Sequence, residues 1–440
     1  MDLHAIAFDA SGRLLAGTDV GVHRSDNAGN AWRSLNEGLS IAQFYPSVSI
    51  HPSDENFFLG GLQDNGTARR GSNGTWSRVL GADGGYTALH PDSPNILFSQ
   101  TQHTGNLFKS TNGGKNFQDS SSGINSSDRD AFMCPTVFDP NDPNVLFYGT
   151  HRIYRSTNLG DSWSAISGDL TDGGPLAAIR AIAWAPSDSS IVYASTTDGK
   201  LLVGDDGGTQ WTARLTDLGD WSRITRDITI AQWDVDTAYM GVPRFGVDQV
   251  LKTADRGESW TALDGDLPDI PVNAVDVHRS ETGDIFLFIG TDRDVRISCD
   301  EGGHWTTLAD ADLPNTIVTE VRYQPDLERL VVATQGRGAG RVENAAPEEF
   351  SEICASNDDD DDGGEDDDDG DDGSENENGD TSDHDSGSDD DLSGCGCRSN
   401  PRRLPVGLVA LSGIAAQLHR RRPRRAPSAQ PPANRRTRSR

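Results

Sequence analysis

Two aspartates, Asp64 and Asp83, are the residues of this sequence whose type and setting best suit chemistry. Both lie in glycine-rich segments, Asp64 within residues 61–66 and Asp83 within residues 82–86. A pair of carboxylates about 5 to 10 Å apart can hydrolyse a glycosidic bond. The same segments could instead bind Ca²⁺ through carboxylate and carbonyl oxygens, or the aspartates could cap turns. The residues alone leave these three interpretations open.

Further polar side chains would be needed to complete a ligand site at these loops. We assign Gln63, Asn65, Arg129, Asp130 and Arg337 to it as binding residues. No C-x-x-C pair and no recognisable Ser, His and Asp arrangement occurs, so we predict neither a zinc site nor a serine nucleophile. We assign no metal and no cofactor, with Ca²⁺ as the one ion that these loops could hold. Five aromatic residues either line a sugar-stacking surface or, as we expect for most, pack inside the fold: Trp221, Trp233, Tyr239, Phe245 and Tyr323.

A repeated turn predicts the elements that position these loops. The pattern Ser/Thr-x-Asp/Asn-x-Gly-x-x-Trp/Phe occurs in four clear and two weaker copies. The Asp or Asn side chain can accept main-chain N–H groups of the turn, and glycine supplies a backbone conformation that other residues reach only with strain. The aromatic residue begins the next strand and packs back onto the sheet. The residues in these structural roles are Ser25, Asn27, Gly29, Trp32, Ser110, Asn112, Gly114, Phe117, Ser156, Asn158, Gly160, Trp163, Asp206, Gly208, Trp211, Asp255, Gly257, Trp260, Ser298, Asp300, Gly302 and Trp305.

Four short apolar or alternating stretches surround each turn, as in residues 131–166, and they are separated by Pro, Gly, Asn and Asp. The repeat length is about 45 residues, which is typical of one four-stranded blade. We therefore predict an all-β fold, a single β-propeller of seven to eight four-stranded blades over residues 2–344. The eighth repeat has only three strands, and we expect its fourth strand to come from a segment before Asp2. This favours a chain that is truncated at its N-terminus and has lost its leader there.

Charge divides the C-terminal part from the rest of the chain. The 20 acidic residues of 358–391 and the 12 arginines of 398–440 leave a net charge of −23 on residues 1–357. An acidic propeller excludes nucleic acid as its partner, because phosphate binding needs a basic face. Residues 345–393 are too polar to bury a core and are predicted to be a disordered linker. Residues 394–425 hold a Cys motif, a short apolar run and an Arg cluster, and residues 426–440 form a disordered basic tail.

The repeated turn resembles the Asp-box, or BNR, repeat of sialidases, xyloglucan-specific endoglucanases, sortilin-type receptors and the photosystem II assembly factor. The chain looks most like bacterial secreted propellers labelled sortilin-like or glycosyl hydrolase, on segments 61–66, 82–86 and 336–338. This resemblance implies a propeller and leaves its chemistry open, because the fold serves enzymes and receptors alike. The arginine cluster, Arg-Ile-Pro signature and Tyr nucleophile of sialidases are not found here.

The tail resembles MYXO-CTERM sorting signals, in which a Cys motif, an apolar run and an Arg cluster follow one another. The resemblance implies that Cys395 or Cys397 is the point of processing and anchoring to a membrane or cell surface. A plain disordered basic tail is the alternative. We therefore expect an extracytoplasmic, secreted or surface-anchored protein.

The function that we infer from the sequence is that of a binding module for a glycan or a protein ligand. We expect a monomer, and we lean against an enzyme. The alternatives are a glycoside hydrolase that uses Asp64 and Asp83, and an assembly or scaffold factor with a large exposed patch.

Overall fold

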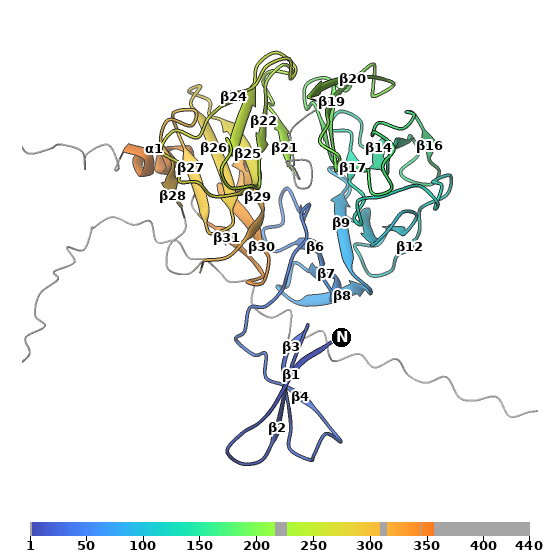
Figure 1. Cartoon of the computed structure of the whole chain (residues 1–440), viewed down its shortest axis with the longest axis vertical. Helices are drawn as coiled ribbons and strands as arrows, with labels where there is room; N and C mark the ends of the chain where they lie inside the picture. The colour runs from blue at the N-terminus through green and yellow to red at the C-terminus, as the bar shows by residue number, and fades with distance from the viewer. Residues whose placement is uncertain (1, 216–226, 309–314, 344, 356–440) are drawn as a thin grey trace, which may run out of the picture.

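The computed structural model describes residues 2–215, 227–308, 315–343 and 345–355. It contains eight antiparallel sheets in chain order, seven of four strands and one of three. Seven of these sheets form a closed ring of blades, and the first sheet projects from the ring (Figure 1). The prediction of an all-β propeller of seven to eight blades is therefore confirmed, with seven blades in the ring.

Each blade is a meander whose strands pair with their neighbours in sequence. The projecting sheet consists of β1 (Leu3–Phe8), β2 (Leu14–Thr18), β3 (Gly21–Ser25) and β4 (Arg33–Ser34). The next three blades are β5 (Ser49–Ile50), β6 (Phe58–Leu62), β7 (Gly66–Arg70) and β8 (Trp76–Leu80); β9 (Gly84–Leu89), β10 (Leu97–Thr101), β11 (Leu107–Ser110) and β12 (Gln118–Asp119); and β13 (Thr136–Phe138), β14 (Leu146–Gly149), β15 (Ile153–Ser156) and β16 (Ser164–Ala165). Then follow β17 (Ile179–Trp184), β18 (Val192–Thr196), β19 (Leu201–Asp205) and β20 (Gln210–Leu215); and β21 (Ile228–Ile230), β22 (Ala238–Gly241), β23 (Val250–Thr253) and β24 (Thr261–Ala262). The last two blades are β25 (Val272–Arg279), β26 (Ile285–Thr291), β27 (Val295–Ser298) and β28 (Thr306–Thr307); and β29 (Val318–Gln324), β30 (Arg329–Thr334) and β31 (Ala339–Val342), with the 3₁₀ turn η2 (Pro325–Leu327) between β29 and β30.

The ring closes between its last blade and the blade β5–β8. The N–H of Phe44 donates to the carbonyl oxygen of Thr334 at 2.9 Å, and the N–H of Gly338 donates to that of Ala42 at 3.0 Å. Phe44 also lies in an apolar core that both blades share, where it packs with Val331. Closure therefore rests on apolar packing and loop hydrogen bonds, and not on a strand shared between the two ends of the ring.

The repeated turns have the geometry that their residues predict. At Ser156 the buried hydroxyl donates to Asn158 Oδ1 at 2.9 Å and accepts the N–H of Gly160 at 2.8 Å, while Asn158 Oδ1 also accepts the N–H of Ser162 at 3.0 Å. The turns at Ser25, Ser110, Thr253 and Ser298 repeat this pattern.

The turn of blade β17–β20 departs from this pattern, and the role assigned to Asp206 is corrected. Gly204 stands where the other turns have a hydroxyl residue. Asp206 itself takes a positive φ of 53°, and its carboxylate accepts the hydroxyl of Thr209 at 3.2 Å. Without the hydroxyl that holds the Asp or Asn side chain in place, this turn adopts another conformation.

One aromatic side chain that follows a turn fills each junction between neighbouring blades. It comes from the blade that is later in the chain, or from the blade β5–β8 where the ring closes, and it packs into the core that the two blades share. Six junctions use Trp76, Phe117, Trp163, Trp211, Trp260 and Trp305. At the seventh junction the blade β29–β31 has no fourth strand, and the fully buried Phe350 fills the core instead.

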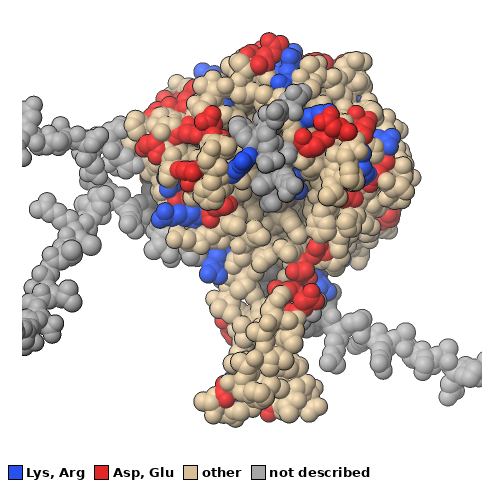
Figure 2. Space-filling view, in the orientation of Figure 1, with Lys and Arg blue, Asp and Glu red and all other residues tan. Residues whose placement is uncertain are grey.

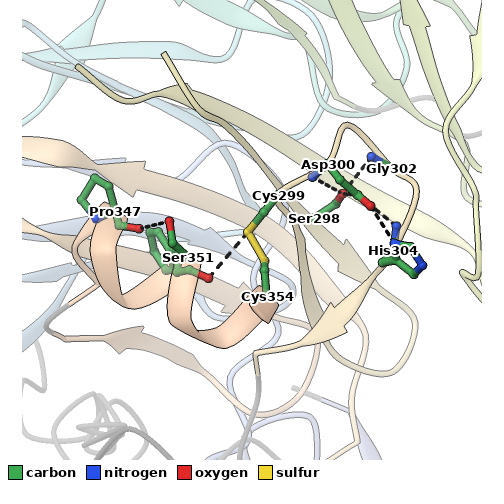
Figure 3. Close-up of a disulfide and its surroundings, with 9 residues drawn as sticks. Ser298, Cys299, Asp300, Gly302, His304, Pro347, Ser351 and Cys354 are labelled. Carbon is green, nitrogen blue, oxygen red and sulfur yellow. Dashed lines mark hydrogen bonds and ion pairs between the residues drawn. A yellow bond between two sulfur atoms is a disulfide. The ribbon is translucent and has the colours of Figure 1, made fainter. Parts of the chain in front are cut away.

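Phe350 belongs to helix α1 (Pro347–Ala355), which packs on the outside of the blade β25–β28 (Figure 1). The helix is also attached covalently, because Cys354 forms a disulfide with Cys299 inside a repeated turn (Figure 3). Neither feature was predicted from the sequence, because the predicted linker begins at residue 345 and Cys299 was assigned no partner. Phe350 of this helix fills the core to which the strand expected from a segment before Asp2 would have contributed. Cys134 is a free, buried cysteine.

The projecting sheet has the strand order of a blade, but it lies outside the ring. All six residues of β1 are exposed, whereas the first strands of the ring blades are largely buried. Asn36 attaches the sheet to the chain that leads into the ring, because its side chain accepts the N–H of Val22 at 2.8 Å.

Candidate functional site: the loop face of the ring

All seven predicted site residues lie at one end of the ring. In an antiparallel blade, successive turns alternate between the two ends, so the loop that enters the first strand and the turn between the second and third strands emerge together. We call this end the loop face; the repeated Ser-Asn-Gly turns lie at the other end. The residues on the loop face are Gln63, Asp64, Asn65, Asp83, Arg129, Asp130 and Arg337.

Asp64 and Asp83 come from consecutive blades and lie side by side. The main-chain N–H of Asp64 donates to Asp83 Oδ1 at 2.6 Å, so this carboxylate holds the β6–β7 turn. The side chain of Asp64 is exposed to solvent. Partial burial raises the pKa of Asp64, and the nearby carboxylates of Asp19 and Asp83 raise it further. The structure therefore brings the predicted pair together and gives Asp83 a turn-capping contact.

Hydrogen bonds extend from this pair to the next loops. The N–H of Asp83 donates to Gln102 Oε1 at 3.2 Å, and the N–H of His103 donates to the carbonyl oxygen of Phe132 at 2.8 Å. The His103 and Phe132 rings also meet edge to face, with their centroids 5.3 Å apart. Three neighbouring blades thus contribute to one connected surface.

Asp130 ties the two later loops together. Its carboxylate accepts the main-chain N–H groups of Thr104 and Phe132, each at 2.9 Å. Burial opposes ionisation of this carboxyl, but these hydrogen bonds outweigh it and lower the pKa of Asp130. Arg129 points elsewhere and donates to Asp169 at 2.5 Å. Asp130 and Arg129 therefore support loops and do not converge on Asp64.

The remaining predicted residues lie on the same face without forming one cluster. Asn65 donates to the carbonyl oxygen of Gln63 at 3.1 Å, which closes their own turn. Arg337 is exposed, and its carbonyl oxygen accepts the hydroxyl of Ser40 at 2.5 Å. Gln43 connects the turn of Gln63 with the loop of Arg337. It forms an isolated β-bridge with Gln335, and its carbonyl oxygen accepts a hydrogen bond from the N–H of Gln63 at 3.0 Å.

Outside the repeated turns, backbone strain is concentrated on this face. Among the described residues, four of the eleven with positive φ other than glycine occupy one fixed position of the repeated turns, where strain is part of the turn: Ala28, Leu159, Arg256 and Glu301. Five of the others lie in the loops of the first two ring blades and the loop that follows them, namely Ser47, Asp64, Ala82, His103 and Phe132, with φ between 58° and 71°. Each costs about 1 to 3 kcal/mol, and such residues gather at functional sites. None of the five is glycine, so their residue types do not predict this strain.

The exposed apolar side chains of the ring blades also lie on the loop face. Among the described residues of the ring, the large hydrophobic side chains that are exposed are Phe132, Leu176 and Phe245, and all three lie in loop-face segments. Of the aromatic residues predicted to pack inside the fold, Tyr239 and Tyr323 are buried and Trp233 is partly buried in a core. Trp221 lies outside the described residues.

A buried group of charges that the sequence analysis missed lies between the innermost strands. Arg322 binds Asp227 through both oxygens at 3.1 and 3.2 Å, and it lies 2.8 Å from Glu320. Glu320 in turn accepts the N–H of Ser47 across the ring closure at 2.7 Å. Burial raises the pKa of Glu320 to about 7 against the attraction of Arg322, and it likewise raises that of Asp276 to about 6. These contacts join the blade β29–β31 to the blades β21–β24 and β5–β8, and the contact of Glu320 with Ser47 serves closure.

No three His, Cys, Asp or Glu side chains within the described residues are placed to share a metal ion. Among the same residues, no helix is long and apolar enough to span a membrane. The tail residues Cys395 and Cys397 and the apolar run near them lie outside the described residues.

Comparison with known proteins supports the fold alone. Neither a protein-family pattern nor a curated protein matches the chain. A GH74 xyloglucanase from Xanthomonas campestris superposes with a TM-score of 0.53 and 16% identity over 72% of this chain, which spans about half (54%) of that enzyme. YCF48 from Cyanidioschyzon merolae superposes with a TM-score of 0.50 and 14% identity, over 71% of this chain and 98% of that one. The chain is therefore a β-propeller, and similarity to a glycoside hydrolase is present at the level of the fold.

Proposed function

We propose that the chain is a binding module that takes a glycan or protein ligand on the loop face of its ring. The observation that carries this proposal is that the strained backbone outside the repeated turns and the exposed apolar side chains of the ring coincide there. Folding selects against both features, so their concentration at one end favours a recognition surface. Phe132 has both, with a positive φ of 71° and 39% of its surface exposed.

A ligand of this face should be neutral or basic. Residues 1–357 carry a net charge of −23, and Asp64 adds an exposed carboxylate to the same face as the rings of His103 and Phe132. Figure 2 shows acidic and basic side chains interspersed over the ring in one view, without a continuous basic surface there. A neutral glycan could stack on the aromatic rings, and a basic peptide could pair with the carboxylates.

The test is a screen of the full chain on a glycan array and against an extracellular protein panel, followed by affinity measurements. We expect Phe132→Ala and Phe245→Ala to weaken binding by about 10-fold or more, because exposed aromatic anchors dominate such interfaces. Trp32→Ala is the matched control, since Trp32 is 43% exposed but lies on the projecting sheet. Failure to find any ligand, or an affinity that the loop-face variants leave unchanged, would contradict the proposal.

A glycoside hydrolase is the second candidate, and the raised pKa of Asp64 favours it. A general acid of this kind needs a carboxyl with a raised pKa and a second carboxylate close by. Asp83 is that neighbour, although one of its oxygens accepts the N–H of Asp64. Reducing-sugar release from a panel of polysaccharides would establish this activity if Asp64→Asn and Asp83→Asn both abolish it. Binding without release would exclude hydrolysis of the bound glycan.

The disulfide supports the proposal of an extracytoplasmic location. Structural disulfides persist in oxidising compartments and are rare in reducing ones. The Cys299–Cys354 bond lies between a ring blade and the helix that completes the ring. Mass spectrometry of the protein purified from its native source, after alkylation of free thiols, should find both cysteines unmodified. Alkylated Cys299 and Cys354 would count against an oxidising compartment.

A further inference from the structure

Three arginine side chains gather where the ring closes, at the end opposite the loop face. Arg329 and Arg341 come from the blade β29–β31, and Arg70 comes from the blade β5–β8. Together with the apolar side chains of Phe57 and Val331, they line one narrow pocket, which has room for about one water molecule. The closing junction therefore places three positive charges around a small space.

The three guanidinium groups donate hydrogen bonds to uncharged groups of one loop. Arg329 and Arg341 both donate to the carbonyl oxygen of Glu55, at 2.8 and 2.6 Å. Arg70 donates to the carbonyl oxygen of Asn56 at 3.0 Å and to its side-chain oxygen at 2.8 Å. These contacts hold the loop between β5 and β6 in place, but they bring no negative charge to the arginines.

The charge of Arg329 is buried without an ion pair. Arg329 is 1% exposed, and its Nε donates to the uncharged Oε1 of Gln324 at 2.6 Å. Of the three arginines, only Arg341 pairs with a carboxylate among the described residues, namely that of Glu343. A guanidinium keeps its proton in proteins, so Arg329 cannot avoid the cost of burial by becoming neutral.

Arginines elsewhere in the ring are either paired or reached by water. Arg322 binds Asp227 through two hydrogen bonds at 3.1 and 3.2 Å, and Arg296 binds Asp294 through two at 3.1 Å. Among the described residues, Arg329 is the only arginine that is buried. Its charge therefore lacks both kinds of compensation that the other arginines have.

The three positive charges also oppose one another. Burial lowers the pKa of Arg70 and that of Arg329, and the charge of Arg341 lowers both further. The carboxylates of Asp54 and Glu55 act in the opposite direction, although within the described part of the chain neither forms an ion pair with these arginines. An anion in the pocket would relieve this repulsion and compensate the buried charge.

We propose that this pocket is a binding site for an oxyanion, such as a sulfate or carboxylate group, that places one oxygen among the three arginines. Because the pocket is about as large as a water molecule, it admits one such oxygen and leaves the rest of the group at its mouth. Guanidinium groups suit this role, since they form strong charge-assisted hydrogen bonds with oxyanions. The bound oxygen would contact arginines of both closing blades and so strengthen closure. The site is independent of the ligand site proposed on the loop face.

Isothermal titration calorimetry of the full chain with sodium sulfate, at constant ionic strength, tests this site. We expect saturable binding, which Arg70→Gln should weaken about 10-fold or more because it removes a charge-assisted contact. Arg78→Gln is the matched control, because it removes the same charge from an exposed residue of the next strand and should leave the affinity unchanged. Sodium acetate is the second probe, which shows whether the site also takes a carboxylate.

Hydrogen exchange of the unmodified protein provides a measurement that needs no variant. Amides of residues 54–57 and of β31 should exchange more slowly when sulfate is present, because the anion connects the two blades, and those of β18 should not change. No saturable binding of either anion, or an equal loss of affinity in Arg70→Gln and Arg78→Gln, would overturn the proposal. So would sulfate binding that leaves exchange in residues 54–57 and β31 unchanged, since the anion would then bind elsewhere.

Discussion

Glu320 connects the last ring blade to the blade β5–β8. The contribution of this contact to the free energy of unfolding depends on pH. Its carboxylate is 2% exposed, and it accepts the N–H of Ser47 while it lies 2.8 Å from Arg322. Burial raises the pKa of Glu320 to about 7, so the folded protein binds this proton more tightly than the unfolded chain does. Its contribution to stability is therefore fully present below the unfolded pKa and is lost as pH rises towards 7.

We predict that Glu320→Gln removes this part of the pH dependence. From pH 4.5 to pH 7, the free energy of unfolding of the unmodified protein should fall relative to that of the variant, by up to about 3 kcal/mol. Urea denaturation at a series of pH values measures this difference. Glu258→Gln is the control, because Glu258 pairs with Arg214 at the surface with 64% of its side chain exposed. A constant difference between Glu320→Gln and the unmodified protein would contradict the prediction.

Helix α1 takes the role that the fourth strand has in the other blades. Phe350 packs with Phe286, Phe288 and Tyr323, at centroid distances of 5.0 to 5.6 Å. In the other junctions, an aromatic residue of the fourth strand or of the turn before it fills this space. The disulfide then fixes the helix to the neighbouring blade, which limits the freedom of a segment that no sheet hydrogen bonds hold.

Replacing the aromatic side chain of the helix should therefore weaken the whole ring. We expect Phe350→Ala to lower the free energy of unfolding by about 3 to 5 kcal/mol, because it leaves a cavity in a shared core. Phe245→Ala, at a residue 61% exposed, should change it by no more than about 0.5 kcal/mol. Equal effects of the two substitutions in thermal or urea denaturation would show that the helix does not close the ring.

The whole molecule combines a closed ring with one blade that stands alone. Each ring blade shares a core with a neighbour on both sides, whereas no core cluster of the described residues includes the projecting sheet. A lone small sheet with an open apolar face has little to stabilise it. The two parts should therefore differ in stability within one chain.

Hydrogen exchange should separate the two parts. Amides of β2 and β3 should exchange about 10-fold faster or more than those of β18 and β19, the same two strands of a ring blade, because local opening requires less free energy where fewer apolar contacts break. Exchange of both pairs at one common rate would mean that the sheet and the ring unfold as a single unit.

The sequence by itself determined the blade and its repeat. The Ser, Asn and Gly of each turn act through contacts within a few residues, so their pattern predicts the local structure, and alternating apolar stretches predict the strands on either side. It also placed Asp64 and Asp83 in loops of the same kind, and the two were found side by side. Its failure at Asp206 has the same cause, because Gly204 removed the local contact on which the prediction depended.

Only the tertiary structure decided which sheets close the ring and where the exposed surface lies. Leu3, Ile6 and Phe8 have the sequence pattern of a strand, as Ile179, Ile182 and Trp184 do. The two sets differ in exposure because a neighbouring blade packs against the second set and not against the first. The pairing of Cys299 with Cys354, the buried position of Phe350 and the contact of Glu320 with Ser47 all join distant parts of the chain. Such contacts depend on how the blades are arranged in space, which the local pattern of residues does not specify.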